Sequence, residues 1–151
     1  MSTERFIAFY QTFERIIKNI KRISAPVMQQ YGLRSVHTTA VLALRNFPDG
    51  LTVTELAKEC FVDKALSSRM IRELSAGEFV SAVPESGNKN YNKRYVLTAK
   101  SRKMLTELNC IITEFVSEAG QNISTEDLLT FYRVLAELDS NIDIITRTQN
   151  N

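Results

Sequence analysis

The chain has 151 residues, 44% of them hydrophobic, and contains five Gly and three Pro, which suits a single, mostly helical domain with its own core. The net charge of +2 is distributed unevenly: +3 on residues 1–57, +5 on residues 58–103 and −6 on residues 104–151. A middle segment that binds a polyanion would produce this distribution, and so would chance variation of the surface charge. No apolar run reaches the roughly 18 residues of a membrane span, charges interrupt the N-terminal segment where a signal peptide would be apolar, and two cysteines make neither a disulfide framework nor a metal quartet. We therefore expect a cytoplasmic protein without metal, cofactor or membrane partner.

The first predicted element is a long N-terminal helix. Apolar residues recur at intervals of one and three residues from Phe6 to Ile20, and they form one stripe that is rich in aromatic rings. Pro26 is expected near the end of this helix, because a proline disfavours the helical conformation of the residue before it. Gly32 follows as a break, and Ser35 is expected to cap a second helix whose inner face holds Val36, Ala40, Val41 and Leu44.

Two short helices are predicted after a turn at residues 47–50. Thr52 and Glu55 stand three residues apart, which is the spacing of a capping box, where each side chain satisfies a free backbone donor at the start of a helix. Asp63 is a good cap for the next helix, which we expect over residues 64–76. The inner face of the first of these helices is expected to hold Val53, Leu56, Ala57 and Cys60.

A β-hairpin and two long helices complete the predicted order. Residues 79–84 and 91–97 look like two strands around a polar turn. Thr98 can cap one long helix and Ser124 the last one. Apolar residues of the last helix recur at intervals of three and four, which is the heptad pattern of a helix that packs against another helix.

Two short helices joined by a tight turn and followed by a basic hairpin are typical of a winged helix-turn-helix. The second helix of such a motif fits the major groove of DNA, where base edges can be told apart, and the first crosses the backbone. The hairpin reaches phosphates or the adjacent minor groove. The expected fold class is therefore mainly α with a small β-hairpin wing. No glycine-rich phosphate loop, nucleophile elbow or carboxylate pair occurs in the sequence, so we expect no enzyme.

The recognition-helix segment carries a family resemblance. With DKALSSRMIREL (63–74), LTVTELAKECFV before it and RYVLTAKSRKML after it, the chain resembles the MarR family of bacterial transcription regulators over essentially its whole length. The strongest matches are Leu51-Thr52, Glu55-Leu56-Ala57, Asp63-Lys64, Ser68-Arg69, Leu74 and Leu97-Thr98.

The resemblance implies one MarR-like domain over residues 1–151. Its winged helix-turn-helix lobe would span residues 35–98, and residues 1–31 and 99–147 would form interlocking dimerisation helices. It further implies a homodimer that binds double-stranded DNA at a pseudo-palindrome, most often as a repressor. In this family a small aromatic or lipophilic effector, or thiol oxidation, often lowers the affinity for DNA.

The outward face of the recognition helix supplies the first candidate DNA contacts. Lys64 is expected to bind phosphate, Ser68 a phosphate or a base edge, and Arg72 the backbone. Arg69 has the fork geometry for guanine or for bidentate contact with phosphate; the alternatives are a solvated charge or an ion pair with Glu73. Thr52, Ala65 and Leu66 are also expected among the residues that contact DNA.

Two orientations of the Leu66 side chain are predicted as alternatives. On the outward face it could touch a thymine methyl group, and alternatively it turns toward the core and leaves Ser67 outside. The family usually has an apolar residue at position 67, where this chain has serine, so the register of these two positions stays open.

The predicted wing departs from the family pattern, in which Asp-x-Arg precedes Leu-Thr and the Arg enters the minor groove. Aligned from Leu97-Thr98, those two positions are Lys89 and Tyr91. We expect Lys89, Asn90, Lys93 and Arg94 to make the contacts instead, with a purely structural role as the alternative for Arg94. The missing pair leaves room for a second function, a winged helix that binds protein and has weak or no affinity for DNA.

Other candidate residues concern the dimer, the effector and the thiols. Tyr10 and His37 are candidates for an effector pocket, although His37 can equally be a polar cleft residue. Cys60 is expected in the core, and Cys110 lacks the basic neighbours in sequence that favour thiol sensing. The expected dimerisation residues, of which the aromatic ones could also line a ligand site, are Phe6, Phe9, Phe13, Ile17, Phe115, Phe131, Leu135, Leu138, Ile142 and Ile145.

Overall fold

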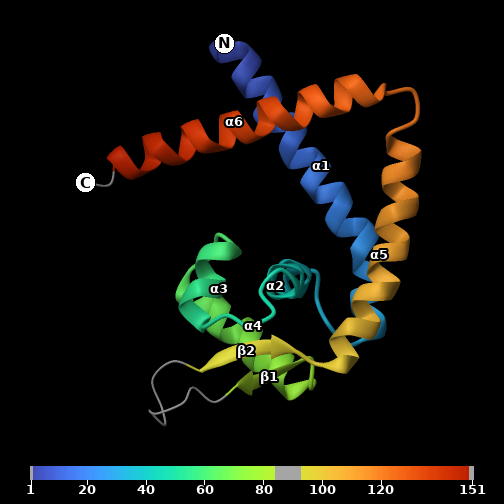
Figure 1. The fold of residues 1–151 in the computed structure, drawn as a ribbon, viewed down its shortest axis with the longest axis vertical. Helices are drawn as coiled ribbons and strands as arrows, with labels where there is room; N and C mark the ends of the chain where they lie inside the picture. Colours follow the sequence, from blue (N-terminus) through green and yellow to red (C-terminus); the bar gives the residue numbers. More distant parts are fainter. Residues whose placement is uncertain (1, 84–92, 150–151) are drawn as a thin grey trace. The chain divides into compact units, whose positions relative to one another are not determined.

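The computed structural model describes residues 2–83 and 93–149, and within them six helices and one two-stranded antiparallel sheet (Figure 1). The elements in chain order are α1 (Thr3–Gln30), α2 (Val36–Arg45), α3 (Val53–Glu59), α4 (Lys64–Ala76), β1 (Val80–Val83), β2 (Arg94–Leu97), α5 (Ala99–Ala119) and α6 (Thr125–Gln149). The predicted order of helices and hairpin, and with it the mainly helical fold class, is confirmed. None of the described helices is apolar over enough length to cross a membrane.

The chain forms two compact units, residues 1–113 and residues 114–151. The first unit contains α1 to α4, the sheet and the larger part of α5. The second unit contains the end of α5 and all of α6.

The starts of α3 and α4 follow from local sequence. The hydroxyl of Thr52 accepts the backbone N–H of Glu55 at 3.2 Å, and the Glu55 carboxylate accepts the backbone N–H of Thr52 at 2.8 Å, so the predicted capping box is present. The Asp63 carboxylate accepts the backbone N–H of Leu66 at 2.7 Å and begins α4. Both caps satisfy backbone donors that the first helical turn leaves free.

Pro26 lies near the end of α1 as expected, but the helix does not break there, and the expected side-chain cap of α2 is wrong. α1 continues through Pro26 to Gln30, because the buried Val27 and Met28 anchor its last turn in the core although Pro26 donates no backbone hydrogen bond. Ser35 occupies the N-cap position of α2, but its side chain makes no capping hydrogen bond. Its backbone is already helical (φ −56°, ψ −24°), whereas a capping side chain normally accompanies an extended backbone.

The sheet carries the base of the wing. Val80 pairs with Leu97 and Val83 with Arg94, in the region where both strands are predicted. A β-bridge between Leu51 and Tyr95 adds the segment before α3 to this sheet. The turn just before it needs Gly50, whose φ is +81° and whose added Cβ would lie 2.7 Å from the carbonyl oxygen of Tyr95.

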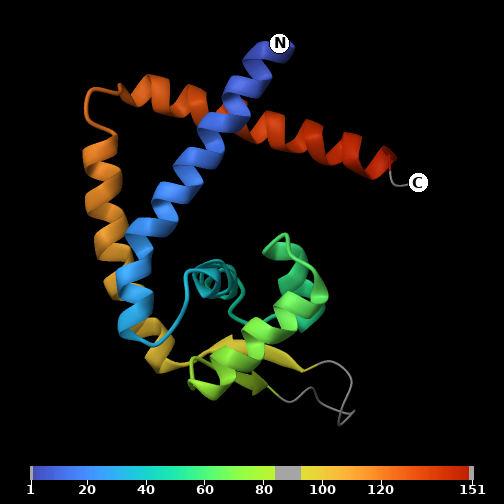
Figure 2. The same ribbon diagram turned by 180° about the vertical axis from the view of Figure 1, so that it is seen from behind.

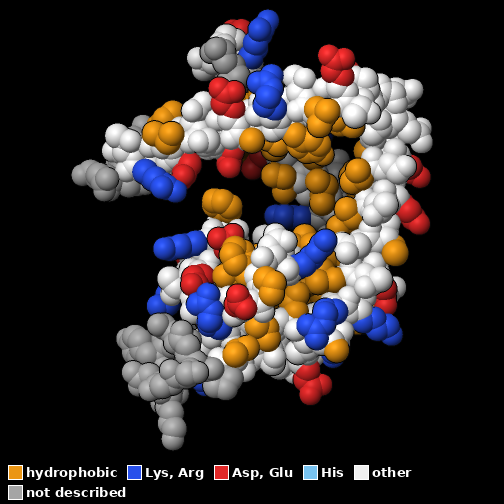
Figure 3. Space-filling model, viewed as in Figure 1, with side chains coloured by type: hydrophobic (Ala, Val, Ile, Leu, Met, Phe, Trp, Pro, Cys, Tyr) orange, Lys and Arg blue, Asp and Glu red, His pale blue; other side chains and the backbone are white. Residues whose placement is uncertain are grey.

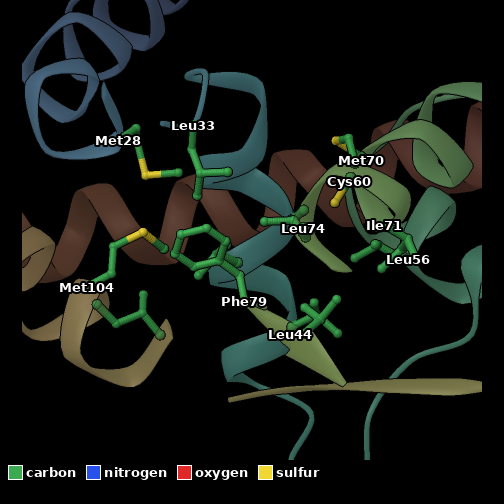
Figure 4. Packing of buried hydrophobic residues seen from close by; sticks show 14 of the residues in the cluster. Met28, Leu33, Leu44, Leu56, Cys60, Met70, Ile71, Leu74, Phe79 and Met104 are labelled. Atoms are coloured by element: carbon green, nitrogen blue, oxygen red, sulfur yellow. The ribbon is translucent and has the colours of Figure 1, made fainter. Parts of the chain in front are cut away.

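The core lies where α1, α2, α4, β1 and α5 meet around Phe79, which is 1% exposed. In Figure 4 the Phe79 ring lies among Met28, Leu33, Leu74 and Met104, which come from four different segments of the chain. Burial of such an aromatic ring removes a large apolar area from water and stabilises the packing of these segments. The shared core therefore holds α4 and the base of the wing in a fixed position relative to each other.

Candidate nucleic-acid interface

The helix pair α3–α4 positions the candidate recognition surface (Figure 2). Ser67, which is fully buried, donates its hydroxyl to the backbone carbonyl of Val53 at 2.8 Å and so ties α4 to the start of α3. Leu66 is half-buried and packs against the core. The turn of Leu66 toward the core, expected in the second alternative, is confirmed. Ser67 is not outside, as that alternative expected, because it faces α3 and finds an acceptor there.

The outward face of α4 consists of exposed side chains. Lys64, Ala65, Ser68, Arg69 and Arg72 are all exposed, as their spacing on a helix requires. No hydrogen bond or ion pair engages the cationic groups of Lys64, Arg69 or Arg72 within residues 2–83 and 93–149. These three cations are therefore available to an external anion, and Figure 3 shows Lys and Arg side chains on the surface of the α2–α4 region.

The expected alternative partner of Arg69 is engaged elsewhere. One guanidinium nitrogen of Arg34 donates to both carboxylate oxygens of Glu73, at 3.0 and 2.7 Å. The imidazole Nε2 of His37 lies 2.8 Å from the same carboxylate. The hydrogen bond from Arg34 is the main cause that holds the pKa of Glu73 below its usual value.

His37 is 2% exposed, and its Nδ1 accepts the backbone N–H of Arg34 at 3.0 Å. Both ring nitrogens thus face groups of the protein at the junction of α2 and α4. This placement agrees with the plainer alternative for His37, a polar residue in a cleft.

The base of the wing is tied to α3 by an ion pair. The guanidinium of Arg94, at the start of β2, lies 3.2 Å from the Glu55 carboxylate, which is the structural role left open for this arginine. The capping hydrogen bond from Thr52 is the main cause that lowers the pKa of Glu55. Lys93 is exposed beside this pair, and Lys89 and Asn90, like Tyr91, lie outside the described residues. Thr52 is half-buried and uses its hydroxyl oxygen in the cap.

Apolar residues are open to solvent on the long helices of each unit (Figure 3). On α1, the exposed fraction is 41% for Phe6 and 45% for Ile17; on α6, it is 49% for Phe131 and 55% for Ile145. Exposed apolar residues in such numbers are typical of surfaces that bind protein, membrane or ligand. Of the other predicted dimerisation residues Ile142 is exposed, and Phe9, Phe13, Phe115, Leu135 and Leu138 are half-buried.

The two candidate effector residues do not share a cavity. Tyr10 is exposed on α1 and donates its hydroxyl to Glu14, and His37 is buried near α4. A groove of about 350 Å³ lies instead between α1 and α2, with Ile17, Ile20, Leu42 and Thr38 in its lining. The hydroxyl of Thr38 is buried and has no hydrogen-bond partner in the described part of the chain. Sequence reasoning missed this groove, because the α1 stripe was its only local signal.

The thiols differ in burial. Cys60 is buried in the core as expected, and burial raises the pKa of its thiol to about 11. A thiol of that pKa stays protonated at neutral pH and is a poor nucleophile. Cys110 is exposed on α5.

Comparison with known proteins relates the chain to transcription regulators. No protein-family model matches it. The HTH-type transcriptional regulator TcaR of Staphylococcus aureus is 26% identical over 137 residues, which cover 87% of this chain and 89% of that protein. A MarR-family regulator from Silicibacter pomeroyi has a TM-score of 0.74 at 21% identity and 87% coverage of both chains. A MarR regulator from Methanosarcina mazei has a TM-score of 0.79 at 16% identity, with 96% and 94% covered. The resemblance and fold expected from the sequence are thereby confirmed.

Proposed function

We propose that this chain, which has the winged-helix fold of the MarR regulators, is a DNA-binding transcription regulator that recognises a specific site. The observation that carries the proposal is the outward face of α4, where Lys64, Arg69 and Arg72 are exposed beside Ser68 and have no partner among residues 2–83 and 93–149. A helix of 13 residues with such a face fits the major groove. The protein is not expected to be an enzyme, since the relatives above are transcription regulators.

Some of the proposed contacts position the protein on the DNA backbone, and others read the base sequence. Lys64 at the start of α4 and Arg72 one turn beyond Arg69 suit phosphates, which give affinity without sequence information. Arg69, at the centre of the exposed face, suits a guanine edge. Lys93 and the residues of the wing tip, Lys89 and Asn90 among them, would add phosphate contacts.

The regulator is proposed to act as a homodimer. The apolar residues exposed on α1 and α6 need cover, and a second copy with the same stripes supplies it. Two copies of α4 would then address half-sites about one helical turn apart. Occupation of a promoter site by such a dimer would repress transcription, and a cytoplasmic location follows from a chromosomal target.

An effector is proposed to bind the groove between α1 and α2. Its apolar walls at Ile17, Ile20 and Leu42 suit an aromatic or lipophilic molecule. The hydroxyl of Thr38, which has no hydrogen-bond partner among the described residues, offers one polar contact. A panel of phenols and aromatic carboxylates, titrated against the DNA complex, should contain compounds that weaken it. Thr38→Val should reduce that response and leave DNA binding without ligand intact.

Selection of bound DNA from a random pool, followed by anisotropy titration at fixed salt, tests the function. Arg69→Ala should weaken binding to the selected site by about 1–3 kcal/mol. Arg22→Ala, which removes an exposed arginine of α1, is the control and should change little. Absence of any enriched site, or equal binding by Arg69→Ala, would favour the alternative of a winged helix that binds protein.

A further inference from the structure

The carboxylate of Glu73 lies on the same helix as the proposed DNA contacts. Glu73 follows Arg69 by four residues, so the two side chains share a face of α4. Side chains on a helix lean toward its N-terminus, which would bring the Glu73 carboxylate toward the Arg69 guanidinium. An acidic group in that place would neutralise Arg69 and repel phosphates.

The structure holds Glu73 away from that position. Its two oxygens accept one nitrogen of Arg34 at 3.0 and 2.7 Å, and Nε2 of His37 lies 2.8 Å from one of them. Arg34 lies between α1 and α2, outside the recognition helix. His37 is buried, and the backbone N–H of Arg34 donates to its Nδ1, which joins both partners into one unit. Arg69 is left without a partner in the described chain.

We propose that Arg34, backed by His37, is a positioning residue that holds Glu73 and thereby keeps the Arg69 guanidinium free to bind DNA. The inference rests on the proposed function, because it concerns how Arg69 is made available. It assigns to a loop residue outside the helix-turn-helix a part in DNA recognition that does not require contact with DNA.

The test is a set of variants titrated on the selected site at fixed salt. Arg34→Ala should lower the affinity about threefold to tenfold, because Glu73 then competes for Arg69. The double variant Arg34→Ala/Glu73→Gln should regain wild-type affinity, because the competing charge is gone. Glu73→Gln alone should bind at least as well as the wild type. In an Arg69→Ala background, the loss caused by Arg34→Ala should shrink.

Each outcome decides between positioning and another role. If Arg34→Ala/Glu73→Gln stays as weak as Arg34→Ala, then Arg34 contacts DNA directly or supports only the fold, and the proposal is overturned. An unchanged affinity of Arg34→Ala also overturns it. If Arg34→Ala unfolds the protein, Glu73→Gln still tests the role of the Glu73 carboxylate, because it keeps Arg34 in place. Weaker DNA binding by folded Glu73→Gln than by the wild type contradicts the proposal. If the wild type binds no site, or Arg69→Ala has no effect, the proposed function itself fails.

Discussion

The hydroxyl of Ser67 on α4 donates a hydrogen bond of 2.8 Å to the backbone carbonyl of Val53, the first residue of α3. Ser67 is fully buried, so water cannot replace this bond. The contact sets how α4 lies on α3, and with it which side chains of α4 face outward.

Ser67→Ala should therefore destabilise the protein by about 0.5–1.5 kcal/mol, because it removes a buried hydrogen bond between the two helices. Urea unfolding followed by circular dichroism measures the change. Ser68→Ala is the matched control on the exposed face and should stay within about 0.5 kcal/mol of the wild type. Equal stability of Ser67→Ala and the wild type would show that this bond does not hold the helix pair.

Gly32 and Gly50 both have positive φ, so the stability costs of replacing each with alanine can be compared directly. Gly50 (φ +81°) would place a Cβ 2.7 Å from the carbonyl oxygen of Tyr95, whereas nothing lies within 4 Å of a Cβ added to Gly32 (φ +70°). Gly32→Ala should cost about 1–2 kcal/mol through its backbone conformation alone. Gly50→Ala should cost more, because it also strains the bridge at the base of the wing. Thermal unfolding ranks the two, and a smaller loss for Gly50→Ala would contradict this account.

Phe61 in the turn between α3 and α4 has φ +53° and is 93% exposed. An aromatic residue in the left-handed region carries strain that glycine avoids. Phe61→Gly should therefore stabilise the protein by about 0.5–1 kcal/mol, the gain being partly offset by the greater entropy of unfolded glycine. Phe61→Ala, which keeps the Cβ, should not show this gain. Destabilisation by Phe61→Gly in chemical unfolding would indicate that the ring makes a stabilising contact.

Glu55 makes stability depend on pH. The Thr52 backbone hydrogen bond, helped by Arg94, lowers the pKa of this carboxyl in the folded protein. Its stabilising contribution is therefore fully present above the unfolded pKa near 4.3 and is lost as the pH falls through the lower folded value. The stability difference between the wild type and Glu55→Gln should be largest at pH 6–7 and shrink toward pH 3. A difference that stays constant across this range would show that ionised Glu55 is not the stabilising form.

Local sequence was sufficient to predict most helix starts. The cap at Asp63 and the box at Thr52 and Glu55 involve partners three residues apart, so their geometry follows once a helix begins. Pro26 and Ser35 show the limit of such rules. The buried last turn of α1 outweighs the proline, and the backbone of Ser35 does not present its hydroxyl to the helix.

The chain's own order of residues thus determined the winged helix-turn-helix and the basic outward face of α4, because periodicity and capping act within a few residues. Tertiary structure alone decided that Ser67 faces Val53 and that Glu73 binds Arg34 rather than Arg69. Glu73 and Arg34 are 39 residues apart, and only the packing of α2 against α4 brings them within bonding distance. For the same reason Arg94 meets Glu55 only after the sheet has formed.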